Sequence, residues 1–154
     1  KKPAYVLGVG EYLSHNSISN MADLTVSGAA RSGPKAFQMA GLKPADVKAI
    51  ELYDAFTINT LLFLEDLGFC PKGEGGRFVS GGNIAPGGKC NVNTNGGGLS
   101  YCHPGMYGIF LLIEAVRQIR GERGDAQVPD AEVGVVSTFA GPDHATLVLT
   151  REVA

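Results

Sequence analysis

The chain has 154 residues, 44% of them apolar and 18% charged, and its formal net charge is −2. This composition is typical of one globular domain with a core of its own, and the small net charge gives no reason to expect nucleic acid or an anionic membrane as a partner. No apolar run approaches the roughly 20 residues that span a bilayer, so no membrane segment is expected.

The three cysteines, Cys70, Cys90 and Cys102, are an odd number at wide spacing. Such a pattern is a poor disulfide framework and favours a reducing compartment, so we predict a cytoplasmic protein. The close cysteine pairs of structural zinc sites are missing, so no metal is predicted even though His103 follows Cys102. The sequence begins at Lys1 without a methionine, which favours a piece of a longer protein.

Apolar periodicity and turn residues divide the chain into alternating strands and helices. In chain order they predict a strand at residues 4–12, a helix at 28–41, a strand at 47–52, a helix at about 55–67, a short strand at 89–94, a helix from about 105 to 120, and strands at 132–139 and 145–151. A polar stretch leads from the first strand to Ser27, and residues 70–88 are glycine-rich and predicted as a loop. Asp54 or Thr57 can cap the second helix. The first half of the last helix is apolar nearly all round, so we expect it to lie buried.

The order β-α-β-α-β-α-β-β predicts one α/β domain over residues 1–154, with a five-stranded sheet and helices on both faces. The last two strands are joined by a tight turn at residues 140–144, too short for parallel neighbours, so the sheet is mixed. The role of His144, which lies in that turn, stays open. Ligands of such sheets gather at the carboxyl ends of the strands. Two loops run from such an end into a helix, after the second and third strands, and we expect them to lie close together.

The second of these loops, "NTNGGGLSYCHPGMYG" at residues 93–108, gathers reactive side chains beside flexible backbone. Pro104 biases His103 toward an extended conformation, which can aim the imidazole, the usual proton carrier near neutral pH. Residues 96–98 are glycines, which allow close approach and offer N–H donors. Alternatively, His103 is an interior histidine with satisfied hydrogen bonds and the glycines only turn a corner.

Tyr53 and Tyr101 each stand at the mouth of the predicted sheet. A phenol there can donate to a developing oxyanion or exchange a proton, although aromatic residues at strand ends also commonly only pack. Cys102 is a less favoured nucleophile, because neighbouring residues on extended backbone point to opposite sides and His103 faces the site.

The run "IELYDAFTINTLLFLEDLGFCPKGEGG", together with "NTNGGGLSYCHPGMYG" and "QIRGE", resembles the C-terminal half of the thiolase superfamily. The nearest branch is that of the sterol-carrier-protein-type, or lipid-transfer-protein-type, thiolases, and the similarity runs from about Ala29 to the end. The resemblance implies two such halves stacked as α-β-α-β-α layers, a homodimer, a coenzyme A thioester as substrate and no cofactor. The N-terminal half, which carries the reactive cysteine, is absent from this chain.

The resemblance also implies roles for single residues. His103 in "CHP" matches the family's catalytic histidine, and "YDAF" from Tyr53 onward stands at the motif that supplies an oxyanion-hole group. We expect the residues beside these motifs to bind substrate: Asp54, Gly97, Gly98, Pro104 and Gly105.

Three departures from the family pattern speak against ordinary thiolase activity. Tyr53 stands where the family has Asn or His, Cys102 stands where it has glycine, and the penultimate loop "STFAGPDH" lacks the usual cysteine. One branch similar in these places consists of aldolases that act on steroid side-chain acyl-CoA thioesters and work bound to an OB-fold partner of the DUF35 type. The resemblance thus implies a retro-aldol lyase with Tyr53 and Tyr101 as acid and base and His103 as oxyanion donor.

Two other functions stay open. One is an acetyl-CoA acyltransferase, a β-ketothiolase of the sterol-carrier type in which His103 is still active. The other is a non-catalytic module that binds acyl-CoA or a partner subunit. Because half of a composite site should be inert, we expect the isolated chain to be inactive and to self-associate through an exposed apolar face.

Overall fold

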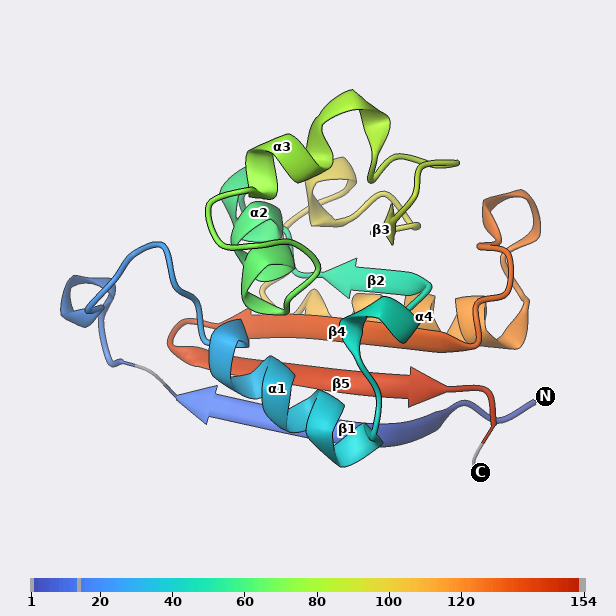
Figure 1. The fold of residues 1–154 in the computed structure, drawn as a ribbon, viewed down its shortest axis with the longest axis horizontal. Coiled ribbons are helices and arrows are strands. Elements are labelled where there is room, and N and C mark those ends of the chain that lie inside the picture. The colour runs from blue at the N-terminus through green and yellow to red at the C-terminus, as the bar shows by residue number, and fades with distance from the viewer. Residues whose placement is uncertain (1, 14, 153–154) are drawn as a thin grey trace.

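The computed structural model describes residues 2–13 and 15–152, and its centre is one five-stranded sheet in the order β1-β5-β4-β2-β3 (Figure 1). The strands are β1 (Tyr5–Leu13), β2 (Ala49–Leu52), β3 (Asn91–Val92), β4 (Val133–Ala140) and β5 (Asp143–Thr150). β2 pairs in parallel with β3 and β4, whereas β5 pairs antiparallel with β4 and β1. The predicted mixed sheet is confirmed.

Helices cover both faces of this sheet, as the sequence predicts. The helices are α1 (Ala29–Ala40), α2 (Thr57–Asp66), the short α3 (Gly75–Val79) and α4 (Gly108–Arg120). Single 3-10 turns lie at Ile18–Asn20, Pro44–Asp46, Ser80–Gly82, Gly98–Ser100 and Gly124–Ala126. α1 and α2 lie on one face and α4 lies on the other (Figure 1).

α1 packs directly on β1 because β1 carries glycines where the two elements meet. A Cβ atom at Gly8 would lie 2.0 Å from the carbonyl oxygen of Ala36, and one at Gly10 would lie 1.9 Å from that of Ser32. Any larger residue would push the helix off the strand. α1 then ends at Gly41, which takes the left-handed conformation of a helix C-cap at φ 68°, as predicted.

Three segments leave the sheet at the same edge. They follow the carboxyl ends of β1, β2 and β3 and cover residues 15–28, 53–56 and 93–107. The sequence predicts the second and third of them. The first joins them because β5 lies between β1 and β4 and pairs antiparallel with both, so β1 runs parallel to β4. Three segments of the chain therefore border the edge where a ligand is expected.

The structure corrects three expectations about single elements. The stretch predicted as loop at residues 70–88 contains α3, and the predicted strand at 89–94 shortens to the two-residue β3 at the edge of the sheet, which leaves Cys90 outside the strand. The first half of α4 is not buried in this chain. Its outer face carries large apolar side chains that are about half exposed: Ile109, Phe110 and Ile113.

Candidate active site

Tyr53 and His103, from two separate loops, meet at the carboxyl edge of the sheet. Tyr53 is the first residue after β2, and its N–H donates to the Ser137 carbonyl oxygen of β4 at 2.9 Å. Its phenol oxygen lies 3.4 Å from Nδ1 of His103, and the two rings meet edge to face at 5.9 Å between centroids. Tyr53 is buried and His103 is exposed, so the pair has one fixed member and one member open to a ligand.

The ring of Tyr53 is held by aromatic neighbours on two sides. Its centroid lies 5.7 Å from that of Tyr107 at the start of α4 and 5.1 Å from that of Phe139 in β4. Both contacts are edge to face, a favourable geometry for aromatic pairs. The phenol therefore keeps one direction, toward His103.

The Asp54 carboxylate joins the two loops. It accepts a hydrogen bond from the N–H of Gly98 at 2.7 Å and another from the N–H of Leu99 at 3.2 Å. Asp54 therefore does not cap α2, where the side chain of Asn59 instead accepts the N–H of Phe56 at 2.9 Å. In this geometry Asp54 positions the glycine loop.

Gly97 must be glycine for this loop to close on Asp54. Its φ is 72°, and a Cβ atom there would lie 2.1 Å from Oδ2 of Asp54. Its N–H donates to the Asn95 side chain at 2.9 Å, while the N–H of Gly98 is used by Asp54. The sequence predicts that these glycines offer N–H donors to a ligand. In the structure, protein oxygens already accept from the N–H groups of Gly97 and Gly98, so these two donors are not free for a ligand.

Asn93 continues the pairing of β2 beyond the end of β3. Its N–H donates to the Ile50 carbonyl oxygen at 2.8 Å, and its side-chain oxygen accepts the N–H of Leu52 at 2.7 Å. Its φ of 50° turns the chain sharply at this point. These bonds explain why the loop begins at a fixed place beside Tyr53.

The remaining predicted site residues are open to solvent. Tyr101 is 70% exposed and, among the described residues, forms no hydrogen bond or ring contact with Tyr53 or His103. Cys102 is exposed, as are Pro104 and Gly105, the two residues that follow His103. The structure brings Tyr53, Asp54 and His103 together and leaves the Tyr101 side chain open to solvent.

A buried polar network lies beneath the loop, on the α4 face of the sheet. The hydroxyl of Thr94 lies 2.9 Å from Oε1 of Glu51 and 2.6 Å from Oε1 of Glu114, and it accepts from Gln118 at 2.9 Å. Glu114 also pairs with Arg123, Oε1 to Nε, at 2.8 Å. A hydroxyl has one proton and can donate to only one of the two carboxyl groups, so the other must donate to it.

Glu51 is the carboxyl that keeps its proton. Burial above all raises the pKa of Glu51 to about 8, and the nearby charge of Glu114 adds to the rise. Within the described part of the chain, Oε2 of Glu51 is buried without a hydrogen-bond partner. The sequence carries one signal for this group that the predicted site does not use: Glu51 stands two positions before Tyr53, so the two side chains point to the same side of an extended chain.

His144 is a buried residue on the face of the sheet opposite to α4. Its Nε2 lies 2.9 Å from the Ser137 hydroxyl, and its ring meets that of Phe63 at 4.7 Å and that of Phe139 at 6.4 Å. Burial lowers the pKa of His144 to about 4, so the ring is neutral near pH 7.

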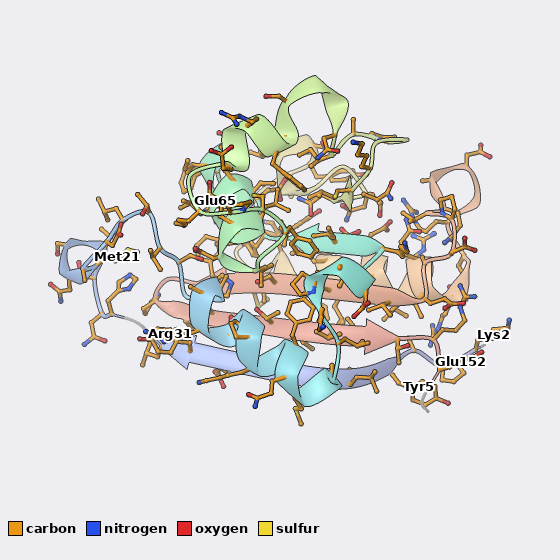
Figure 2. The ribbon with its side chains drawn as sticks, in the orientation of Figure 1. Lys2, Tyr5, Met21, Arg31, Glu65 and Glu152 are labelled. Atoms are coloured by element: carbon orange, nitrogen blue, oxygen red, sulfur yellow. The ribbon has the colours of Figure 1, made fainter. Side chains whose placement is uncertain are left out.

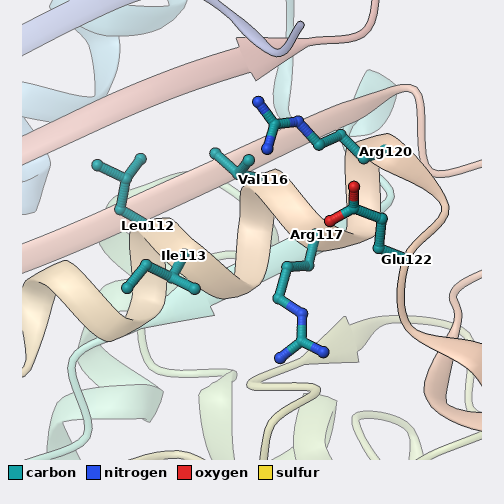
Figure 3. Close-up of a pocket in the computed structure, with 6 residues that line it drawn as sticks. All are labelled: Leu112, Ile113, Val116, Arg117, Arg120 and Glu122. Carbon is teal, nitrogen blue, oxygen red and sulfur yellow. The ribbon is translucent and has the colours of Figure 1, made fainter. Parts of the chain in front are cut away.

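One hollow lies away from this edge. It has a volume of about 730 Å³ and lies on the outer face of α4 (Figure 3). Its walls are apolar toward the middle of the helix and charged toward its end: Leu112, Ile113, Val116, Arg117, Arg120 and Glu122. This hollow lies on the exposed face of α4, and none of the predicted site residues lines it.

Among the described residues, no helix is long and apolar enough to cross a membrane. No group of three or more His, Cys, Asp or Glu side chains among them could hold a metal ion.

The chain is similar to several known proteins. The model of the family described as "Thiolase C-terminal domain-like" matches residues 10–151. The acetyl-CoA acetyltransferase of Methanothermobacter thermautotrophicus is 38% identical over 90% of this chain and 37% of its own length. The 17-hydroxy-3-oxo-4-pregnene-20-carboxyl-CoA lyase of Mycobacterium tuberculosis is 50% identical over 58% of this chain and 22% of its own length.

A solved structure extends the likeness to three dimensions. The Ltp2-ChsH2(DUF35) aldolase superposes with a TM-score of 0.86 and 31% identity over 97% of this chain and 40% of that one. The chain thus spans well under half the length of the relatives it matches.

Proposed function

The chain belongs to the thiolase C-terminal domain-like family, and from this membership we propose that it supplies one half of the active site of a retro-aldol acyl-CoA lyase. The substrate is a β-hydroxyacyl-CoA of the steroid side-chain type. The observation that carries the proposal is the Tyr53–His103 pair at the carboxyl edge, beside a β4–β5 turn that contains no cysteine. The named activity of the Mycobacterium tuberculosis lyase supports it.

The proposed reaction needs a base, an acid and an oxyanion donor. A base removes the proton of the β-hydroxyl, the C–O bond becomes C=O, and the Cα–Cβ bond breaks with its electron pair moving into the thioester as an enolate. An acid then protonates Cα. We assign the base and acid to Tyr53 and Tyr101, and the donor to His103, whose Nδ1 faces Tyr53 and whose Nε2 is left for the thioester oxygen.

The other predicted site residues have supporting roles in this proposal. Pro104 and Gly105 are exposed beside His103 and would touch the substrate. Asp54, Gly97 and Gly98 act one step back, since their mutual bonds give the loop its shape.

The site is completed by other protein. The half-exposed apolar face of α4 supports burial against an N-terminal thiolase half, within a homodimer in the cytoplasm. The name of the Ltp2-ChsH2(DUF35) aldolase supports a DUF35 partner as well. In this proposal the chain alone is inactive.

The test uses the full-length protein with its DUF35 partner and a 17-hydroxy steroid acyl-CoA thioester. We expect a 17-ketone and propionyl-CoA in equal amounts. Tyr53→Phe and Tyr101→Phe should each lower kcat by about 100-fold or more, the usual contribution of an acid–base group. Tyr5→Phe is the control, because Tyr5 lies beside the two termini at the opposite end of the sheet (Figure 2). Absence of both products would refute the assignment, and full activity of Tyr101→Phe would remove its role.

A second candidate function is an acetyl-CoA acyltransferase. The 38% identity with an acetyl-CoA acetyltransferase over 90% of the chain favours it. Formation of acetyl-CoA from acetoacetyl-CoA and coenzyme A, without cleavage of β-hydroxyacyl-CoA, would select this function over the lyase.

A further inference from the structure

A second hollow, separate from the one on α4, opens at the catalytic edge itself. Its volume is about 480 Å³, within the range of pockets that hold drug-sized ligands. Apolar side chains from the segment of residues 15–28 and from the start of α2 line it: Ile18, Met21, Leu24, Phe56, Ile58 and Leu62. Figure 2 labels Met21 in this segment, at the end of the molecule opposite the termini.

These apolar side chains are left open to water around the hollow. Ile18 is 70% exposed, Leu24 is 64% exposed and Phe56 is 68% exposed. Keeping apolar surface in water costs about 25 cal/mol per Å², and a gathered patch of this kind marks a binding site more often than a scattered residue does. The three side chains come from two segments far apart in sequence, so they converge on one space.

The hollow adjoins the Tyr53–His103 pair. Phe56 lies three residues after Tyr53 on the same loop. Phe139, whose ring contacts that of Tyr53 at 5.1 Å, lines the hollow and also lines a neighbouring hollow that includes Tyr53. A molecule that reacts at Tyr53 can therefore extend past Phe139 into this space.

Three ionisable residues line the hollow: His15, Asp143 and His144. His144 lies there with its Nε2 held at the Ser137 hydroxyl, and its depressed pKa keeps the ring neutral near pH 7. Asp143, an exposed carboxylate, stands at the rim. This lining suits an uncharged apolar group and disfavours the phosphates of coenzyme A.

The wall formed by residues 15–28 is fastened at its far end. The Asp66 carboxylate accepts the N–H and the hydroxyl of Ser27, each at 2.7 Å, and pairs with Lys72 at 2.7 Å. Lys72 also donates to the Thr25 carbonyl oxygen. The segment is thus held over α2 while its apolar residues stay open toward the hollow.

We propose that this hollow receives the bulky, uncharged end of the acyl group, on the scale of a fused ring system, while the thioester lies at Tyr53 and His103. The inference rests on the proposed function for the position of the thioester. It adds the residues that select the substrate: Ile18, Leu24 and Phe56 form a specificity wall, and short acyl groups leave that wall unused.

The first test is binding by the chain. The neutral polycyclic dye Nile red is titrated in, and a neutral steroid ketone is added as competitor. We expect saturable dye emission that the ketone displaces. Leu24→Trp and Ile18→Trp, which fill the hollow from exposed positions, should each weaken dye affinity at least tenfold, and Met39→Trp, at a 68% exposed position of α1 that does not line the hollow, should not. Dye binding that is absent, or that persists in both filling variants, overturns the proposal.

The second test is selectivity in the full-length protein. Leu24→Trp should lower the ratio of kcat/KM for a bulky β-hydroxyacyl-CoA to kcat/KM for a short one at least tenfold. An unchanged ratio refutes the specificity wall. If the unmodified protein cleaves neither substrate, the proposed lyase function fails, and the dye measurement alone decides whether the hollow is a binding site.

Discussion

The loop of residues 93–108 and the segment of residues 15–28 border the same edge but are attached to it in different ways. The loop is bonded to neighbouring elements over its first half: Asn93 to β2, Thr94 to Glu51 and Glu114, and Gly98 to Asp54. The segment is fixed mainly at its end, through Ser27 and Asp66. The difference matches their proposed tasks, because acid–base chemistry needs fixed distances whereas an apolar wall can adapt to its ligand.

The two regions also rest on buried groups of opposite character. Glu51 under the loop holds a proton that an ordinary glutamate would have lost at pH 7, and His144 under the hollow lacks a proton that an ordinary histidine would gain in mild acid. A change of pH therefore acts on the two regions from opposite directions, which gives a way to probe each one separately.

Glu51→Gln should have the largest effect and should act on the loop. The unfolded glutamate titrates near 4.5 and the folded one at about 8, so the native state binds more protons between these values. The stability of the unmodified chain then falls by about 1.4 kcal/mol per pH unit as the pH rises through this window, by about 4 kcal/mol in total. The Gln variant should gain this amount relative to the unmodified chain, as measured by urea unfolding from pH 5 to 8.5. A constant difference between the two would show that Glu51 is ionised throughout.

Asp54→Asn should loosen the loop directly. The amide turns one donor toward the N–H of Gly98 or Leu99, so one charge-assisted bond becomes a contact between two donors. We expect a loss of about 3 kcal/mol in the free energy of unfolding and faster hydrogen exchange at residues 93–99. Asp143→Asn, which changes an exposed aspartate at the start of β5, serves as the matched control. Equal stability of the two variants would deny Asp54 its anchoring role.

The sequence could predict the loop far better than the segment. The apolar periods, the helix-ending Gly41 and the tight β4–β5 turn encode the mixed sheet locally, and the order of strands then brings Tyr53 close to His103. Residues 15–28 carry no such period. They reach the edge because β1 pairs with β5 from a distant part of the chain, and no local pattern records that pairing.

The buried groups mark a second limit of sequence reasoning. Glu51 and Glu114 have the same charge and lie far apart in sequence, so only the fold shows that they share the hydroxyl of Thr94. The exposure of Ile113 has a related cause. An apolar helix predicts burial, and in the proposed assembly the N-terminal thiolase half that covers this helix is not part of this chain.

His144→Gln tests how the buried histidine that lines the hollow affects stability in acid. The unfolded histidine titrates near 6.5 and the folded one at about 4, so the unfolded state binds more protons below pH 6.5 and the stability falls as the solution is acidified. From pH 6.5 to 5 the loss should be about 2 kcal/mol. The Gln variant should start less stable, because the ring contact with Phe63 is gone, and should lack this part of the acid slope. Parallel stability curves over that range would mean that His144 is protonated in the folded chain.

Lys72→Met should have the smallest effect on stability and should appear mainly in the mobility of the segment. The Lys72 ammonium is partly exposed and pairs with Asp66 and Glu65, a class of interaction worth about 1 kcal/mol or less. Without it Asp66 still accepts from Ser27, so the fold persists, but the Thr25 carbonyl loses its donor. Hydrogen exchange should therefore quicken at residues 25–27 and stay unchanged at residues 93–99. Arg77→Met removes a surface ion pair with Glu74 that does not touch the segment, so it should change neither region. Equal exchange in the two variants would mean that Ser27 and Asp66 alone hold the wall in place.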